Sequence, residues 1–189
     1  LAIAVEAFGW RESSIVLAML TFIVGVLIFL TVRDPEKLEH TKGHGGYGEL
    51  LRIRELWFVF PIILCGYMTV AGLRGSWIGP FHADMYGFDT LQIGRVTLFM
   101  SIAMVLGTFA YGSMDRIFNT RKYVVFAGNL GTLTCCLLMV MFMPREPFWG
   151  SLAFVVIGFV GSNYAVQMAH GKSFLPPHLA GRGVTLLNF

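Results

Sequence analysis

The chain has 189 residues, of which 56% are hydrophobic and 13% are charged, and its mean hydropathy is +0.68. These values lie outside the usual balance of a soluble domain, which excludes an ordinary soluble protein. The net charge of +3 gives no indication of a nucleic-acid partner, and the three cysteines have no metal-ligand spacing. The sequence shows no nucleophile triad or phosphate-binding glycine loop, so we expect no metal, no cofactor and no enzymatic activity.

Long apolar stretches alternate with polar loops along the chain. A bilayer core about 30 Å thick is crossed by about 20 apolar helical residues. Stretches of this length occupy 14–32, 57–77, 93–112, 123–143 and 148–169. The sequence therefore predicts an all-α polytopic membrane protein with about five complete transmembrane helices. Because the chain starts at Leu1 rather than Met and 184–189 looks like the start of another span, we expect a piece of a longer protein.

The longest connection, 33–55, follows the first apolar stretch. It is polar and rich in glycine, and it ends in ELLRIRELW, whose apolar residues predict a weakly amphipathic helix on the membrane surface. His40 and His44 have the spacing of a metal pair on a helix, but their glycine neighbours favour a solvated loop. We interpret 33–55 as a linker between two membrane bundles.

Basic residues are concentrated in alternate loops. The loops 33–55, 114–122 and 170–183 hold most of the 14 lysines and arginines, whereas the opposite loops hold only Arg11 and Arg145. Loops rich in lysine and arginine stay in the cytoplasm. The pattern predicts that these three loops are cytoplasmic in a multi-pass protein of the inner (plasma) membrane.

Two arginines lie inside apolar stretches. Arg74 and Arg95 are each about 10 Å from the centre of their span at 1.5 Å per residue, on the outer side. At this matched height they could draw an anion into an outer vestibule. Alternatively, each side chain extends to the interface and pairs with Asp84 or Asp89.

Four uncharged polar residues inside the spans are further candidates for binding a solute. Asn163 and Gln167 share one helical face at i, i+4, and that face must point at protein or water. A hydrogen bond between helices is the alternative for this pair. Tyr67 and Ser101 could line a cavity, although a hydroxyl in such a helix more often bonds the carbonyl of the preceding turn.

The turn GSMDRIFNTRK (112–122) resembles the basic signature between helices of the major facilitator superfamily. The matching positions are Gly112, Asp115, Arg116, Arg121 and Lys122. The spacing differs from the usual pattern, and Asn119 stands where glycine is usual, as in the looser second copy of the signature. FGWR (8–11) resembles the entry to the sixth helix of the superfamily, and 73–90 and 169–189 resemble a bacterial subgroup loosely called nitrate/nitrite-type or sugar-phosphate-type permeases.

This resemblance implies part of a twelve-helix fold, from the end of helix five to the start of helix eleven. Residues 1–32 would end the N-terminal bundle, 33–55 would link the bundles, and 56–189 would form an incomplete C-terminal bundle. The missing N-terminal half of the same chain and the lipid bilayer would be its partners. Helices seven, eight, ten and eleven would line the cavity.

The resemblance also implies secondary active transport of a small solute, an anion if the arginines bind it, by alternating access with a proton or sodium as coupling ion. Asp115 would then act as a cytoplasmic gate, with a capped turn that never moves as the alternative. A polytopic membrane enzyme or a non-transporting membrane sensor is the alternative function. No acidic residue lies within the five stretches, and 33–55 is too short for a soluble domain, so transport is favoured.

Overall fold

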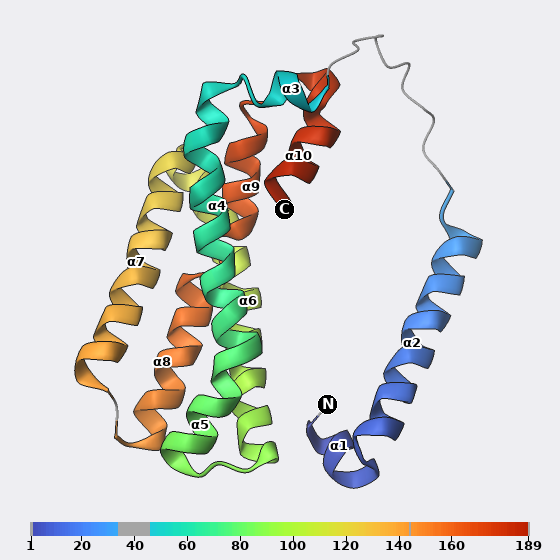
Figure 1. Cartoon of the computed structure of the whole chain (residues 1–189), viewed down its shortest axis with the longest axis vertical. Coiled ribbons are helices and arrows are strands. Elements are labelled where there is room, and N and C mark those ends of the chain that lie inside the picture. Colours follow the sequence, from blue (N-terminus) through green and yellow to red (C-terminus); the bar gives the residue numbers. More distant parts are fainter. Residues whose placement is uncertain (1, 34–45, 144, 189) are drawn as a thin grey trace.

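A computed structural model describes residues 2–33, 46–143 and 145–188, and these residues form helices joined by short connections, without β-strands (Figure 1). Five helical segments are long and apolar enough to cross a membrane. They are Trp10–Thr31, Arg54–Tyr86, Thr90–Phe118, Arg121–Phe142 and Pro147–Lys172. The prediction of an all-α polytopic fold with five spans is confirmed, and every span differs from its predicted limits by at least one residue.

The first span stands apart from the other four. The short helix α1 (Ala2–Phe8) precedes α2 (Trp10–Thr31), and Figure 1 shows α2 separated from the bundle. Ser13 is the only buried residue of α2. The region 34–45, including His40 and His44, lies outside the described residues, so the interpretation of 33–55 as a linker is not tested.

The amphipathic surface helix expected over ELLRIRELW does not form as one element. The one-turn helix α3 (Tyr47–Leu50) ends at the second residue of this stretch, and α4 (Arg54–Gly72) begins after the extended residue Ile53. Leu50 is fully buried in a cluster with Leu179 and Leu187. Burying Leu50 removes apolar surface from solvent, which stabilises the bend between α3 and α4.

The second span is longer than predicted and contains a π-helical turn. After α4, the π-helix η1 (Leu73–Trp77) leads without a break into α5 (Ile78–Tyr86), and the N–H of Ile78 bonds the carbonyl of Leu73, five residues back. Gly87 ends the run in the left-handed conformation, at φ 65°.

The third span, α6 (Thr90–Phe118), also extends past its predicted limits. Asp89 accepts a hydrogen bond from the Gln92 amide at 2.7 Å, and the Gln92 side chain accepts one from the Asp89 amide at 3.0 Å. This capping box starts the helix three residues before the apolar stretch. At the other end Asn119 adopts φ 47°, so 114–118 belongs to the helix and the predicted loop 114–122 shrinks to Asn119–Thr120.

The fourth span is α7 (Arg121–Phe142), and the fifth is interrupted. A single helix was predicted over 148–169, but α8 (Pro147–Val160) and α9 (Tyr164–Lys172) are separated by Gly161–Asn163. The Tyr111 hydroxyl donates to the Val160 carbonyl at 2.6 Å. In a continuous helix that carbonyl would accept the Tyr164 amide, so Tyr111 supplies the bond that the break removes.

The segment predicted as the loop 170–183 is mostly helical as well. Residues up to Lys172 belong to α9, the 3₁₀-helix η2 spans Pro177–Leu179, and α10 spans Ala180–Asn188. The helix expected to start at 184 therefore starts four residues earlier, because η2 leads directly into it.

Glycines allow the spans to approach closely. A Cβ on Gly107 of α6 would stand 2.3 Å from the Phe159 carbonyl oxygen, and one on Gly161 would stand 2.2 Å from Val70 Cγ2. Small residues at such positions let helices pack by van der Waals contact, which drives their association in lipid. The buried Met100, Phe154 and Val70 fill the core beside these contacts.

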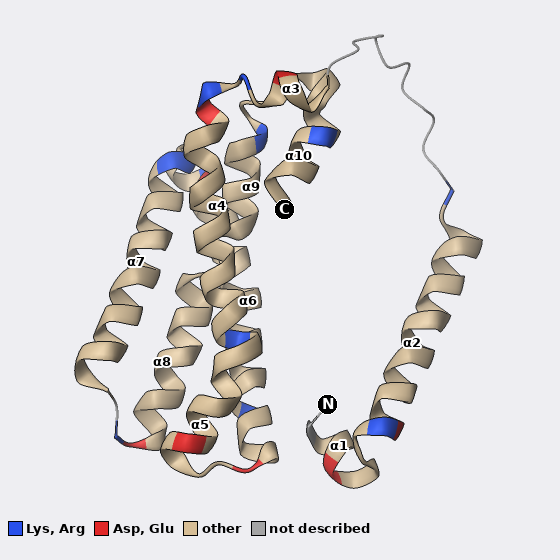
Figure 2. Ribbon diagram, viewed as in Figure 1, with Lys and Arg blue, Asp and Glu red and all other residues tan. Residues whose placement is uncertain are grey.

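The charges are unevenly distributed between the two ends of the bundle. We call the end that carries α3, Asn119–Thr120 and η2 the basic end, because Lys and Arg gather there, whereas carboxylates of the α5–α6 region lie at the opposite end (Figure 2). The described residues 46–55, 114–122 and 170–183 of the three segments predicted to be cytoplasmic lie toward this end of the bundle.

Replacing Gly107 by alanine should destabilise the bundle. The added methyl meets a backbone oxygen that cannot rotate away, so we expect the free energy of unfolding to fall by about 1–3 kcal/mol, as is typical of overpacking. Thermal melting of the purified full-length protein in detergent measures it. Gly112→Ala on the same helix is the control, since its Cβ meets nothing within 4 Å. Equal melting temperatures would contradict the close α6–α8 contact.

Candidate functional site

A hollow of about 280 Å³ lies between α4, α9 and α10. The rings of Tyr67 and Tyr164 meet in it, with centroids 4.7 Å apart at 42°. The Tyr164 hydroxyl donates to the Asn188 side-chain oxygen. We call this the tyrosine hollow. It contains one predicted site residue, Tyr67, and brings Tyr164 and Asn188 to it from helices far apart in the sequence.

Arg74 lies further along the helix face that carries Tyr67. Tyr67, Ala71 and Arg74 are spaced i, i+4 and i+7, which places them on one side of α4 as it enters η1. The Arg74 Nε donates to the Ser101 hydroxyl of α6 at 3.1 Å, and that hydroxyl donates to the Thr97 carbonyl at 2.7 Å. Two predicted site residues, Arg74 and Ser101, are therefore in direct contact.

No carboxylate neutralises Arg74 or Arg95 in the described part of the chain. The alternative in which they pair with Asp84 or Asp89 is therefore not observed, and the Asp89 carboxylate caps α6 instead. Arginines inside membrane spans almost always face protein or a water-filled cavity. The face of α4 that carries Arg74 is thus a candidate wall of such a cavity.

Arg95 belongs to a different hollow. It lines a space of about 400 Å³ with Phe88, Pro147 and Phe148, beside α8. Arg95 and Ser101 are six residues apart on α6, a rotation of about 240° at 3.6 residues per turn. Arg95 therefore lies about 9 Å along α6 from the Ser101 that Arg74 contacts, at 1.5 Å per residue, and on another side of the helix. The matched height expected from the sequence is wrong, because the second span extends to Tyr86 and the third begins at Thr90.

Asn163 and Gln167 are buried in a cluster of amides with Asn129 of α7. Gln167 Nε2 donates to Asn129 Oδ1 at 2.9 Å and to Asn163 Oδ1 at 2.5 Å. Asn163 Nδ2 donates to Asn129 Oδ1 at 3.1 Å. Both Asn163 and Gln167 are only 1% exposed, so they do not line the tyrosine hollow. The geometry is that of hydrogen bonds between helices, the alternative considered for this pair.

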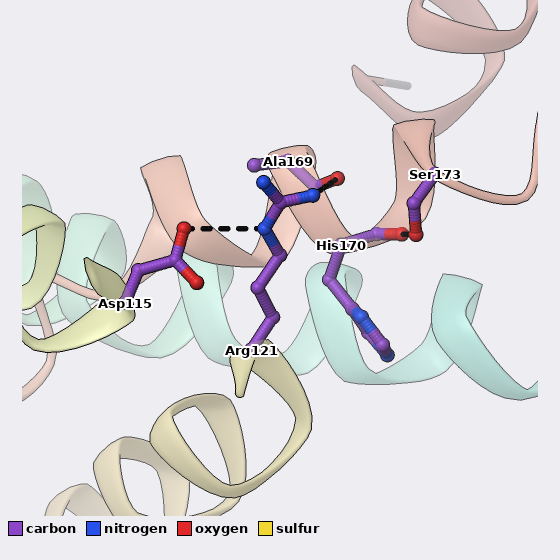
Figure 3. A network of polar contacts seen from close by, with 5 residues as sticks. All are labelled: Asp115, Arg121, Ala169, His170 and Ser173. Carbon is purple, nitrogen blue, oxygen red and sulfur yellow. Dashed lines mark hydrogen bonds and ion pairs between the residues drawn. The ribbon is translucent and has the colours of Figure 1, made fainter. Parts of the chain in front are cut away.

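The basic turn forms a contact between three helices at the basic end (Figure 3). The Arg121 Nε lies 3.1 Å from Asp115 Oδ2, and its Nη1 donates to the Ala169 carbonyl of α9 at 3.3 Å. Asp115 sits in the last turn of α6 and Arg121 begins α7, so each charge is unfavourable toward its own helix dipole. Their pairing neutralises both, and the second bond fastens α9 to the turn. We call Asp115, Arg121 and the Ala169 carbonyl the latch.

The other signature residues do not join the latch. Arg116 is exposed, and the Lys122 amine lies 5.9 Å from the Tyr123 ring centroid. Gly112 has open space where a Cβ would stand. Only Asp115 and Arg121 of the five predicted signature residues form a contact between helices there.

Some residues that shape the site had no clear signal in the sequence. Asn129 was not among the predicted site residues, because an amide in an apolar span does not by itself show which helix it faces. His82 is fully buried, bonds the Ile78 carbonyl at 2.8 Å, and lies 3.2 Å from the Ser151 hydroxyl of α8. In the described residues no three His, Cys, Asp or Glu side chains gather as a metal site.

The comparison with known families gives one result. The family model described as Major Facilitator Superfamily matches residues 1–189, which is the whole chain. No solved structure matches the chain.

Replacing Asn129 by leucine should weaken the bundle, because Gln167 and Asn163 would both lose an acceptor. Buried donors left unpaired cost about 1–3 kcal/mol, and we expect the free energy of unfolding to fall by that amount. Thermal melting of the full-length protein measures it. Thr134→Val is the control, since that exposed hydroxyl bonds only the Leu130 carbonyl of its own helix. If both variants melt alike, the amide cluster contributes nothing to stability.

Proposed function

Because the chain belongs to the major facilitator superfamily and so to a family of multi-pass membrane transporters of small solutes, we propose that it carries a small anion by alternating access. The anion would bind between Arg74, Ser101 and the tyrosine hollow. Members of this superfamily are transporters rather than enzymes, so a membrane enzyme or sensor is not favoured.

The observation that carries this proposal is the uncompensated charge of Arg74. Its guanidinium reaches across from η1 to Ser101 and meets no carboxylate in the described residues. A positive charge held in a low-dielectric wall attracts an anion much more strongly than it would in water. The π-helical turn supports the same assignment, since such turns are frequent at functional sites.

The remaining lining supports a solute with polar groups on a compact body. Tyr67 and Tyr164 present ring faces and hydroxyls, and Asn188 adds an amide. The segment 73–90, which contains Arg74, is one of the two that resemble nitrate/nitrite-type or sugar-phosphate-type permeases. Inorganic oxyanions and phosphorylated sugars are therefore the solutes to test first.

The orientation follows from the distribution of basic residues. The basic end would face the cytoplasm of a cell's inner (plasma) membrane, with 1–32 ending one bundle, 33–55 as linker and 56–189 in the second bundle. Arg74 and Arg95 would then lie toward the outer side, and the latch would lie on the cytoplasmic face.

The latch would gate the cytoplasmic side. Arg121 holds α9 through the Ala169 carbonyl, and α9 also carries Tyr164 at its other end. Movement of α9 away from the turn would break that bond and leave Arg121 with Asp115 alone. Charge-assisted hydrogen bonds are worth about 1.5–3 kcal/mol, enough to bias a two-state equilibrium about ten- to a hundredfold.

Arg74→Gln should reduce transport more than Arg95→Gln. We expect uptake of the transported anion to fall at least about tenfold, because a charge-assisted contact of about 1.5–3 kcal/mol is lost while a hydrogen-bond donor remains for Ser101. The measurement is uptake by the full-length protein in proteoliposomes, with nitrate, phosphate and hexose phosphates as solutes.

Arg95→Gln is the control, with the same chemical change at the arginine that lines the hollow beside α8. A loss of uptake in Arg95→Gln with normal uptake in Arg74→Gln would move the site to the α6–α8 side. Absence of uptake for every anion, together with uptake of a neutral or cationic solute, would overturn the anion proposal.

Asp115→Asn should open the cytoplasmic side. In a background without Cys65, Cys135 and Cys136, the reactivity of Met168→Cys on α9 toward a soluble maleimide should rise several-fold. The reason is that Arg121 loses its ionic partner and holds α9 less firmly. Arg116→Gln removes a charge from the same turn without touching the latch and should change nothing. Unchanged reactivity in Asp115→Asn would leave the contact as a fixed cap.

A further inference from the structure

One polar atom of the amide cluster has no partner. Gln167 Oε1 is the only buried side-chain nitrogen or oxygen without a hydrogen bond in the described residues. Leaving such an acceptor unpaired is costly, and more so inside a membrane, where water is scarce. A buried acceptor that stays unpaired in the native cluster indicates that it binds a ligand.

The position of the Gln167 amide nitrogen indicates what that ligand would be. Its two N–H groups bridge Asn129 Oδ1 and Asn163 Oδ1, at 2.9 and 2.5 Å. A half-turn of the carboxamide exchanges its nitrogen and oxygen. Three amide oxygens would then face one another, an arrangement that repels unless a positive charge stands between them.

The ligand set also limits the charge of the ion. Calcium and magnesium sites are built with carboxylates, whereas this cluster offers only neutral amide oxygens. Neutral carbonyl oxygens are the ligands that proteins use to replace the hydration shell of a monovalent cation. The set therefore fits a small monovalent cation.

The cluster is next to an open space. A hollow of about 450 Å³ between α4 and α7 is lined by Gly66, Thr69, Asn129 and Thr132. A Cβ on Gly66 would stand 2.7 Å from Gln167 Nε2 and 3.2 Å from Asn129 Oδ1. Of the three amides, Asn129 lines the hollow, and glycine at 66 leaves no side chain between the hollow and the buried Gln167, so an ion would reach the cluster past Gly66 and Asn129.

We propose that Asn129, Asn163 and Gln167 form a binding site for a small monovalent cation, sodium being the first to test, and that Gly66 keeps the site open. In the transporter proposed above this cation is the coupling ion, and that second step rests on the proposed function.

The break in the fifth span connects this site to the solute. Asn163 closes the break, and the next residue, Tyr164, lies in the tyrosine hollow. A cation on Asn163 fixes the start of α9 and hence the position of the Tyr164 ring. Coupling between two ligands is reciprocal, so the solute must raise the affinity for the cation by the same factor.

The test is thermal melting of the purified full-length protein at pH 8 without solute, in sodium chloride against choline chloride at equal ionic strength. Sodium should raise the melting temperature of the wild type in a saturable way. Gln167→Leu should abolish the rise, and Gln167→Glu, which adds a carboxylate, should lower the sodium concentration for half-effect at least tenfold. No sodium-specific rise in the wild type, or an equal rise in Gln167→Leu, overturns the site.

A second pair of variants keeps the test decisive where Gln167→Leu does not fold. Gly66→Ala should raise the sodium concentration for half-effect at least tenfold. Gly72→Ala lies on the same helix and its Cβ meets nothing within 4 Å, so this variant should have the half-effect concentration of the wild type. An equal effect of sodium in both variants overturns the site.

Direct binding of radioactive sodium separates this inference from the proposed function. Sodium binding with the expected variant pattern, without uptake of any solute, refutes transport and supports the site. Solute uptake by a protein that shows no sodium binding refutes the site and leaves transport standing.

Discussion

The need to satisfy every backbone and side-chain polar group without bulk water governs the centre of this structure. The fifth span breaks at Gly161–Asn163, near the middle of its 26 residues, where lipid offers no hydrogen bonds. Tyr111 takes over the Val160 carbonyl, the Ser162 hydroxyl donates to the Gly158 carbonyl at 2.6 Å, and Asn163 turns its side chain to α7. The break therefore binds three spans together, because the Val160 carbonyl finds its partner on α6 and the Asn163 side chain finds one on α7.

Glycine determines where these partners can reach. A Cβ on Gly128 of α7 would stand 2.2 Å from Asn163 Nδ2, and the glycine at 66 leaves corresponding room on α4. The amide cluster thus occupies the space that a side chain at position 66 or 128 would need. The same close approach that helps apolar helices associate in lipid here makes space for polar groups, so packing and a buried polar site have one cause.

Hydropathy predicted the number of spans because length and composition alone decide whether a helix can cross a bilayer. It could not predict their ends, since apolar stretches stop at charged residues whereas helices stop at caps such as Asn119. The latch illustrates the same limit: Asp115 and Arg121 were found from a motif, but the Ala169 carbonyl is a backbone atom of a distant segment and has no residue type to search for. Arg74 and Arg95 had equal heights in the sequence, but the helix ends and rotations of the structure place Arg74 against Ser101 and Arg95 in the hollow beside α8.

The π-helical turn η1 amounts to one residue more than an α-helix would need over the same length. That surplus residue rotates everything after it by about 100°, the angle between neighbouring residues of a helix. With it, Arg74 at the start of η1 points to Ser101 of α6, and His82, beyond η1, points to Ser151 of α8. Without it, the second span could form one of these two hydrogen bonds but not both. One inserted residue is therefore sufficient to direct the two ends of a single helix toward two different neighbours. Deleting that residue would restore a regular α-helix, in which the contacts of Arg74 and His82 could not both form.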